Sequence, residues 1–190
     1  MWKRFLVRIF ALLSVTVLAS CGGGSGGSSS GSESGSQEAT TTTSETVLSA
    51  VFLDAFRDFS CTSGWITRRG GLGRAPYAGS GSCSAPFTGE TGTYNVRLKA
   101  QLEFDGSSPY RVSLNGNSIK SGNYPFSQGK LICDCPDHEK NCPDKVIDIN
   151  AGTHQVTKGD IIEFWGDDVY PCGDDSHGSY AIWRGMSFTP

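Results

Sequence analysis

The clearest fold signal in the sequence is the stretch Tyr94-Asn-Val-Arg-Leu-Lys-Ala-Gln-Leu-Glu103. Apolar side chains occupy every second position from Tyr94 to Leu102, and polar side chains occupy the positions between them. Successive side chains of a β-strand point to opposite faces, so this alternation predicts a strand with one face in a core and the other in water.

Further strand signals follow toward the C-terminus. Residues 110–114 lead into Asn115-Gly116, a dipeptide suited to the positive φ angles of a tight hairpin turn, and residues 118–120 form the returning strand. Other predicted strand segments are 146–149, 156, 160–165 and 180–188, with turns at Ala151-Gly152 and Lys158-Gly159-Asp160. Short strands joined by such turns predict an all-β fold, an antiparallel β-sandwich, rather than one of alternating strands and helices.

Residues 47–59 allow two interpretations. Their apolar side chains, Leu48, Val51, Phe52, Ala55, Phe56 and Phe59, fall at helical spacing. The alternative is an opening strand with adjacent aromatic residues, and the pattern alone does not separate the two.

The N-terminus has the pattern of an export signal, residues 1–20. Lys3, Arg4 and Arg8 border an apolar run that is too short to span a bilayer. The run ends in Val17-Leu18-Ala19-Ser20-Cys21, which resembles the lipobox of bacterial lipoproteins. That resemblance implies acylation of Cys21 after cleavage. Because Gly22 follows rather than aspartate, it also implies an outer-membrane lipoprotein, facing the cell surface or the periplasm. The alternative is an ordinary secretory signal with a chance cysteine.

Residues 21–46 comprise the predicted anchor Cys21 and a linker, because they consist mostly of Gly, Ser and Thr with no aromatic side chain. A coil of that length has a root-mean-square reach of roughly 25 to 30 Å. The remaining residues, 47–190, suffice for one hydrophobic core. Without the signal, 13 Lys and Arg face 19 Asp and Glu, a net charge of −6 that argues against nucleic acid as a partner. We expect a monomer.

Six cysteines remain beside Cys21, an even number that favours three disulfides in an exported protein. They are Cys61, Cys83, Cys133, Cys135, Cys142 and Cys172. Proximity in the sequence suggests that Cys61 pairs with Cys83, while the pairing of the other four stays open. A zinc site of Cys133, Cys135, His138 and Cys142 is the weaker alternative, since it needs reduced thiols.

The densest group of aromatic and polar residues lies near the C-terminus. Sugar rings stack their apolar faces on Trp and Tyr, while charged and amide groups bond the hydroxyls, so this segment is the predicted ligand-binding loop. The candidates are Trp165, Tyr170, Asp174, Asp175, His177, Trp183 and Arg184, with Asn123 and Tyr124 as a second group. Trp165 and Trp183 fit a core position equally well, whereas Tyr170 lies in a Pro/Gly loop that favours exposure.

Four aspartates in the same segment suit calcium, which takes six to eight oxygen ligands. They are Asp167, Asp168, Asp174 and Asp175. A solvated acidic turn is the competing interpretation.

Three short motifs resemble carbohydrate-binding modules of families 6 and 35, which have a galactose-binding-like jelly roll. They are Tyr77-Ala-Gly-Ser-Gly-Ser, Gly92-Thr-Tyr-Asn-Val-Arg-Leu and Pro109-Tyr-Arg-Val-Ser-Leu-Asn-Gly. The resemblance implies a jelly-roll sandwich that binds polysaccharide. The paired acidic residues that help such modules hold a structural calcium are replaced by Leu48-Ser-Ala-Val-Phe-Leu-Asp54, and the segment 131–144 is foreign to the pattern.

These observations predict a surface-anchored, non-catalytic lipoprotein that holds plant or algal polysaccharide near the cell. No nucleophile motif, metalloprotease motif or phosphate loop is present in the sequence. The alternatives are a small glycan-cleaving enzyme and an adhesin or other protein-binding lipoprotein.

Overall fold

The computed structural model describes residues 47–173 and 177–190. The predicted signal peptide, the predicted anchor Cys21, the linker, and the candidates Asp174 and Asp175 lie outside the described residues. None of the helical segments described is long and apolar enough to cross a membrane.

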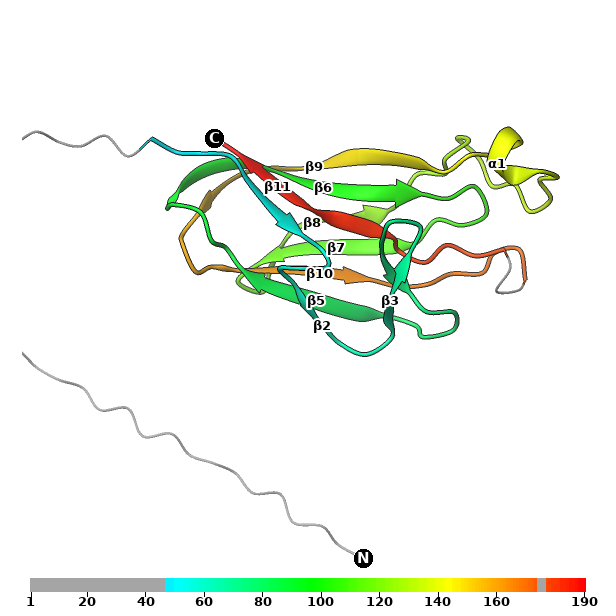
Figure 1. The fold of residues 1–190 in the computed structure, drawn as a ribbon, viewed down its shortest axis with the longest axis horizontal. Helices are drawn as coiled ribbons and strands as arrows, with labels where there is room; N and C mark the ends of the chain where they lie inside the picture. Colours follow the sequence, from blue (N-terminus) through cyan, green and yellow to red (C-terminus); the bar gives the residue numbers. More distant parts are fainter. Residues whose placement is uncertain (1–46, 174–176) are drawn as a thin grey trace, which may run out of the picture. The chain divides into compact units, whose positions relative to one another are not determined.

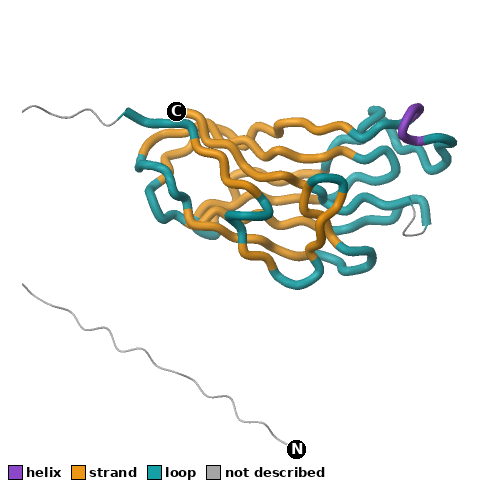
Figure 2. Tube along the Cα trace, viewed as in Figure 1, coloured by secondary structure: helices purple, strands orange, loops and turns teal. Residues whose placement is uncertain are grey.

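Two antiparallel sheets form the fold (Figures 1 and 2). The six-stranded sheet has the order β3-β4-β11-β6-β9, and β1 also pairs with β11. Its strands are β1 (Val51–Asp54), β3 (Trp65–Arg68), β4 (Gly71–Arg74), β6 (Gly92–Leu102), β9 (Lys145–Val156) and β11 (Trp183–Thr189). The five-stranded sheet has the order β2-β5-β10-β7-β8. Its strands are β2 (Ser60–Cys61), β5 (Gly81–Pro86), β7 (Pro109–Leu114), β8 (Asn117–Asn123) and β10 (Ile161–Gly166).

From β5 onward the chain changes sheet at every connection except the β7–β8 hairpin. The predicted antiparallel β-sandwich is therefore confirmed, and this alternation is the connectivity of a jelly roll. One short helix, α1 (His138–Asn141), lies in the segment between β8 and β9, at one end of the sandwich (Figure 1).

The core lies between the inner faces of the two sheets. Tyr94, Val96, Leu98 and Ala100 of β6 are at most 1% exposed, so the alternating pattern is confirmed. At the centre, the rings of Phe164 and Trp183 stack with centroids 4.3 Å apart.

Several predicted boundaries change in the structure. Residues 51–54 form β1, so the opening segment contains a strand rather than a helix. The predicted turn at Ala151-Gly152 is wrong, because β9 runs through it as one strand. A register shift in the β6–β9 ladder between Val96 and Arg97 takes up the extra residue. The last strand begins at Trp183, after Ala181 adopts a left-handed φ of 49°.

Three disulfides join the described cysteines. Cys61 pairs with Cys83, as predicted, where β2 and β5 lie side by side. The open pairing resolves into Cys133–Cys172 and Cys135–Cys142. All three thiols of the alternative zinc site are consumed by these bonds.

A buried carboxylate holds the end of β6 to the chain that leads into β11. Glu103 is fully buried; its Oε2 accepts a hydrogen bond from the Tyr180 amide at 2.8 Å, and its Oε1 lies 3.3 Å from Nη1 of Arg69. Burial raises the pKa of Glu103 to about 7, because loss of hydration outweighs the Tyr180 amide and Arg69, which favour the charged form.

We expect the pH dependence of stability to reveal this group. A carboxyl with a raised native pKa stabilises the fold below its unfolded pKa, and that contribution is lost as the pH rises toward 7. The free energy of unfolding should therefore fall by up to about 3 kcal/mol between pH 4.5 and 7.5. Urea unfolding of wild type and Glu103→Gln at both pH values measures it. The loss should be much smaller in the variant, and equal losses would contradict the assignment.

Candidate functional site

The outer face of the five-stranded sheet carries an aromatic and polar row. On β10 the side chain of Phe164 is buried, so the next residue, Trp165, points to the outer face and is half-buried. The strand ladders place Trp165 opposite Ser82 of β5 and Arg111 of β7, and Arg111 opposite Ser121 of β8. Residues directly opposite share one face of a sheet, so these four side chains form a row across four strands.

Charged groups flank the indole. The guanidinium carbon of Arg111 lies 5.4 Å from the centre of the Trp165 ring, within the range of a cation–π contact. Arg111 also lies 3.8 Å from Glu163, which occupies the same face two residues before Trp165. The indole is thus bordered by one cation and one anion that both remain partly exposed.

A shallow cavity of about 550 Å³ opens beside Trp165. Four of its lining residues are hydroxyl side chains, Thr62, Ser63, Ser80 and Ser82, and backbone from the segment 78–81 completes the wall. Its volume lies within the range of small-molecule sites, and its lining joins an aromatic surface to hydroxyl groups.

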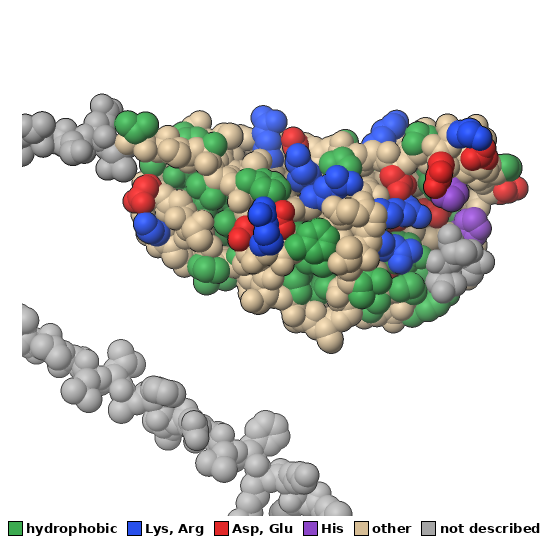
Figure 3. All heavy atoms as spheres, in the orientation of Figure 1, with side chains coloured by type: hydrophobic (Ala, Val, Ile, Leu, Met, Phe, Trp, Pro, Cys, Tyr) green, Lys and Arg blue, Asp and Glu red, His purple; other side chains and the backbone are tan. Residues whose placement is uncertain are grey.

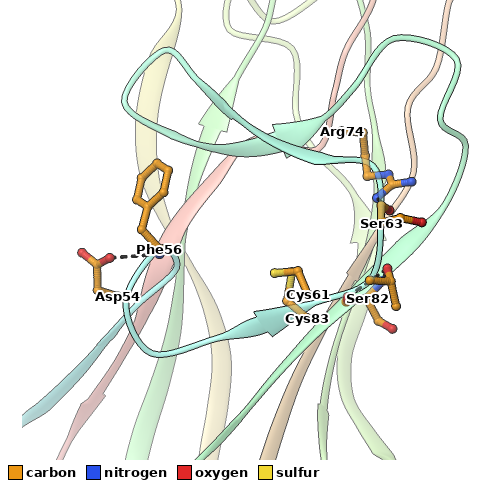
Figure 4. The surroundings of a disulfide bond; sticks show 8 residues. Asp54, Phe56, Cys61, Ser63, Arg74, Ser82 and Cys83 are labelled. Atoms are coloured by element: carbon orange, nitrogen blue, oxygen red, sulfur yellow. Dashed lines mark hydrogen bonds between the residues drawn. A yellow bond between two sulfur atoms is a disulfide. The ribbon is translucent and has the colours of Figure 1, made fainter.

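Arg74 organises this wall, and Figure 4 shows its guanidinium beside Ser63. It is 2% exposed, and its guanidinium donates to the carbonyl oxygens of Ser63, Ala78, Gly79 and Ser80 at 2.6 to 3.2 Å. Burial lowers the pKa of Arg74, while Asp168 and Asp167 favour its charged form. The segment 75–80 therefore wraps around a buried cation. A Cβ at Gly81 would lie 2.3 Å from Nη1 of Arg74, so only glycine leaves room for it.

Two tyrosines, Tyr77 and Tyr170, lie together at the edge of the segment 75–80. The rings of Tyr77 and Tyr170 stack with centroids 4.5 Å apart, and the Tyr77 amide donates to the Tyr170 hydroxyl at 2.6 Å. Tyr77 is 65% exposed, with a left-handed φ of 57°. The Tyr170 hydroxyl donates to the nearly buried Asp168, and Gly178 packs against the Tyr170 ring.

This geometry changes the predicted role of Tyr170. Its ring is covered by Tyr77 and Gly178, so it supports Tyr77 instead of presenting its own face to a ligand. Tyr77 is the exposed aromatic ring of the pair. In the sequence, Tyr77 stood out only as the first residue of the motif Tyr77-Ala-Gly-Ser-Gly-Ser.

Other predicted ligand residues lie apart from Trp165. Trp183 is 0% exposed and Tyr124 is 1% exposed, so neither can stack on a sugar, and both predictions are wrong. Arg184 belongs to β11 of the other sheet, where it donates to Gln101 and to the Arg69 carbonyl. His177 is half-buried, and its Nδ1 has no hydrogen-bond partner among the described residues.

The predicted ligand residue Asn123 is exposed and lies on the outer face of the five-stranded sheet. It pairs with Pro109, two residues before Arg111, so it lies on the face that carries the row. Its amide donates to the Ser107 carbonyl at 2.9 Å. Asn123 therefore extends the polar border at the end of β8.

The calcium prediction stays a prediction. Asp168 is 8% exposed and accepts the Tyr170 hydroxyl through Oδ2, which leaves Oδ1 buried and without a partner among the described residues. No three His, Cys, Asp or Glu side chains within residues 47–173 and 177–190 are grouped to hold a metal ion. The other two proposed ligands, Asp174 and Asp175, fall outside that part of the chain.

The residues predicted from the sequence did not include Thr62, Arg74, Ser82 or Arg111. Ser82 and Arg111 could have been found from strand alternation once the pairing of β5, β10 and β7 was known. Nothing in the sequence indicated that Arg74 is buried, because arginine in a Gly-rich segment is usually a surface residue.

No protein-family model and no curated protein matches the sequence. Solved structures with a similar fold include the β-(1,4)-mannanase GH26-CBM35 of Podospora anserina, with a TM-score of 0.44 and 15% identity over 74% of this chain. The family 35 carbohydrate-binding module of Clostridium thermocellum has a TM-score of 0.43 and 13% identity, over 75% of this chain and 99% of that one. The insecticidal crystal protein Cry2Aa has a TM-score of 0.49 and 12% identity, over 74% of this chain and 21% of that one.

The chain covers only 27% of the mannanase, and every one of these TM-scores is below 0.5. Since the three proteins also differ in kind, the similarity selects no function.

We expect removal of the Tyr170 hydroxyl to lower stability. Tyr170→Phe keeps the ring stack but leaves the buried Asp168 carboxylate without its donor, which costs about 1 to 3 kcal/mol. Thermal unfolding measures the loss. Tyr77→Phe is the matched control, because its own hydroxyl makes no hydrogen bond with a described residue, and it should melt with the wild type. A Tyr170→Phe protein as stable as wild type would show that the hydroxyl does not brace this loop.

Proposed function

We propose that this protein is a non-catalytic, surface-tethered polysaccharide-binding protein whose ligand lies across the outer face of the five-stranded sheet. The observation that carries the proposal is the half-buried Trp165 on that face, bordered by Arg111, Glu163 and Ser82 and open to a hydroxyl-lined cavity. A sugar ring needs this pairing of an aromatic surface with hydrogen-bonding groups around its rim.

The extent of the row favours a polymer over a single sugar. Neighbouring strands lie about 4.8 Å apart, so the distance from Ser82 to Ser121 across three intervals is roughly 14 Å. The cavity is shallow and open, which suits a chain that enters at one side and leaves at the other. Arg74 fixes its wall through four carbonyls, so little ordering is needed when the ligand binds.

The carboxylates near the row support a binding role over glycan cleavage. Glu163 is already paired with Arg111. Asp167 follows four residues later, just after β10 ends at Gly166, and four extended residues span roughly 13 Å. Glycosidases place their two carboxyl groups about 5 to 9.5 Å apart, so this pair does not fit that chemistry.

The predicted lipid anchor on Cys21 is the remaining part of the proposal. The start of the sandwich and its C-terminus lie at the end opposite α1, and β10 runs toward the α1 end (Figure 1). A lipid on Cys21 would be joined through residues 22–46 to the start of the sandwich, where β1 begins. Many tethered copies would raise the effective concentration of weak sites along one polymer.

Trp165→Ala should abolish retardation of the protein in native gels cast with the polysaccharide it recognises. A panel of plant and algal polymers, run with calcium and with chelator, identifies that polymer and tests the calcium prediction. Phe52→Ala is the matched control: Phe52 is 45% exposed but lies on the six-stranded sheet, so its loss should leave retardation unchanged.

Retardation of Trp165→Ala equal to wild type would overturn the site assignment. Failure of every polymer to retard the wild type would overturn the glycan proposal and favour a protein partner. New reducing ends on incubation with the recognised polymer would favour the enzyme alternative.

Cys21→Ala tests the anchor. We expect the wild type to sediment with outer membranes after expression in a Gram-negative host and to return to the soluble fraction only with detergent. The variant lacks the acylation site and should be soluble without detergent. Equal membrane association of both proteins would exclude lipidation at Cys21 as the cause.

A further inference from the structure

The outer face of the six-stranded sheet carries a second row of side chains, which has no part in the Trp165 site. The strand ladders place Phe52 of β1 opposite Ser187 of β11, Ser187 opposite Arg97 of β6, and Arg97 opposite Asn150 of β9. The residues on either side of these four along each strand pack in the core, so the four point outward. In Figure 3, Lys and Arg side chains gather beside hydrophobic ones over β6 and β11.

Phe52 presents an aromatic ring on this face. Its Cζ lies 2.7 Å from the place that a Cβ of Gly185 would take, so the ring covers a position of β11 that has no side chain. Phe52 is nevertheless 45% exposed, and Phe56, in the turn after β1, is 42% exposed. Burial of an apolar ring away from water is favourable, so a partner that covers Phe52 gains free energy.

Two cations of β6 share the face without an anionic partner. Arg97 is exposed and Lys99 is half-buried, and neither forms an ion pair with a described residue. Asp148 lies opposite Lys99 on the edge strand β9, but the two side chains are not within ion-pair distance. Asp54 of β1 is paired with Arg57. The centre of the face therefore offers positive charge to an outside partner.

The charge of the whole molecule restricts how an anionic partner can approach. Without the predicted signal, the chain has a net charge of −6, so an extended anionic surface repels most of it and attracts the face that carries Arg97 and Lys99. The chain also enters the sandwich at β1, the strand that carries Phe52. The predicted tether of residues 22–46 thus leads directly into a strand of this face.

We propose that the outer face of the six-stranded sheet docks on an anionic lipid surface, with Phe52 among the headgroups and with Arg97 and Lys99 on lipid phosphates. The proposal rests on the anchor of the proposed function, because a lipid on Cys21 keeps the domain within reach of the membrane. Aromatic rings combined with long cationic side chains are typical of surfaces that lie on anionic membranes.

Docking by this face also orients the glycan site. The outer faces of the two sheets in a sandwich point in opposite directions. With the six-stranded sheet on the lipid, the row that contains Trp165 faces away from the membrane, where a polymer can reach it.

Binding to vesicles tests the proposal. Residues 44–190 form one compact unit that contains the core and all three disulfides, so they can be used without the signal or Cys21. We expect this domain to sediment with vesicles of phosphatidylglycerol and phosphatidylcholine in equal parts, and not with phosphatidylcholine alone. Arg97→Gln combined with Lys99→Gln should lower the partition coefficient roughly thirtyfold, which is about 1 kcal/mol for each lost cation.

The matched control removes the same charge elsewhere. Lys120→Gln combined with Lys130→Gln changes two exposed, unpaired cations, one on β8 of the other sheet and one in the segment that follows it. Partitioning should stay within about twofold of wild type, because these side chains do not lie on the docking face. An equal loss in both double variants would show a net-charge effect and would overturn the proposal.

The aromatic ring and the glycan site are tested separately. Phe52→Ala should weaken vesicle binding roughly fivefold while polysaccharide retardation stays as in wild type. Trp165→Ala should bind vesicles as the wild type does, so this test stands even if no polymer retards the protein. Failure of the wild type to bind anionic vesicles would overturn the docking face. Vesicle binding that Phe52→Ala leaves unchanged would show that charge alone is recognised, and would overturn the assignment to a lipid interface.

Discussion

Burial of one face of each sheet is the constraint on which the rest of this structure depends. Phe164 of β10 and Trp183 of β11 stack at the centre of the sandwich, and both are completely buried. Because side chains alternate along a strand, a buried Phe164 forces Trp165 to the outer face. The position of the candidate platform is therefore a consequence of the core, and it is as rigid as the strand that carries it.

Arg74 shows how a buried charge can shape a surface. Its guanidinium meets four backbone carbonyls in the segment 63–80, so the loop beside Trp165 closes around a cation instead of an apolar side chain. A buried cation is tolerated only when its donors are satisfied, which makes this loop conformation strongly preferred. The same loop contains the left-handed Tyr77, whose ring stacks on Tyr170.

At the α1 end of the sandwich, the loops are held by disulfides and by a buried carboxylate. Covalent bonds hold the cysteine-rich segment 131–144, and the buried Glu103 holds the chain before β11 through the Tyr180 amide. Arg69 links the two, because it contacts both Glu103 and Asp144. One end of the sandwich is thus a polar network around a carboxylate, whereas the Trp165 face is an aromatic platform supported by the core.

The sequence by itself determined the local features, because their causes lie within a few residues. Alternation from Tyr94 to Leu102 specified β6, Asn115-Gly116 specified the hairpin, and the short separation of Cys61 and Cys83 indicated their disulfide. Only the tertiary structure decided which tryptophan faces outward, which of the remaining cysteines pair, and that Arg69 meets Asp144. Alternation defines two faces of a strand but does not say which face the opposite sheet will cover. That choice depends on contacts between residues far apart in the chain, such as Phe164 with Trp183 and Cys133 with Cys172.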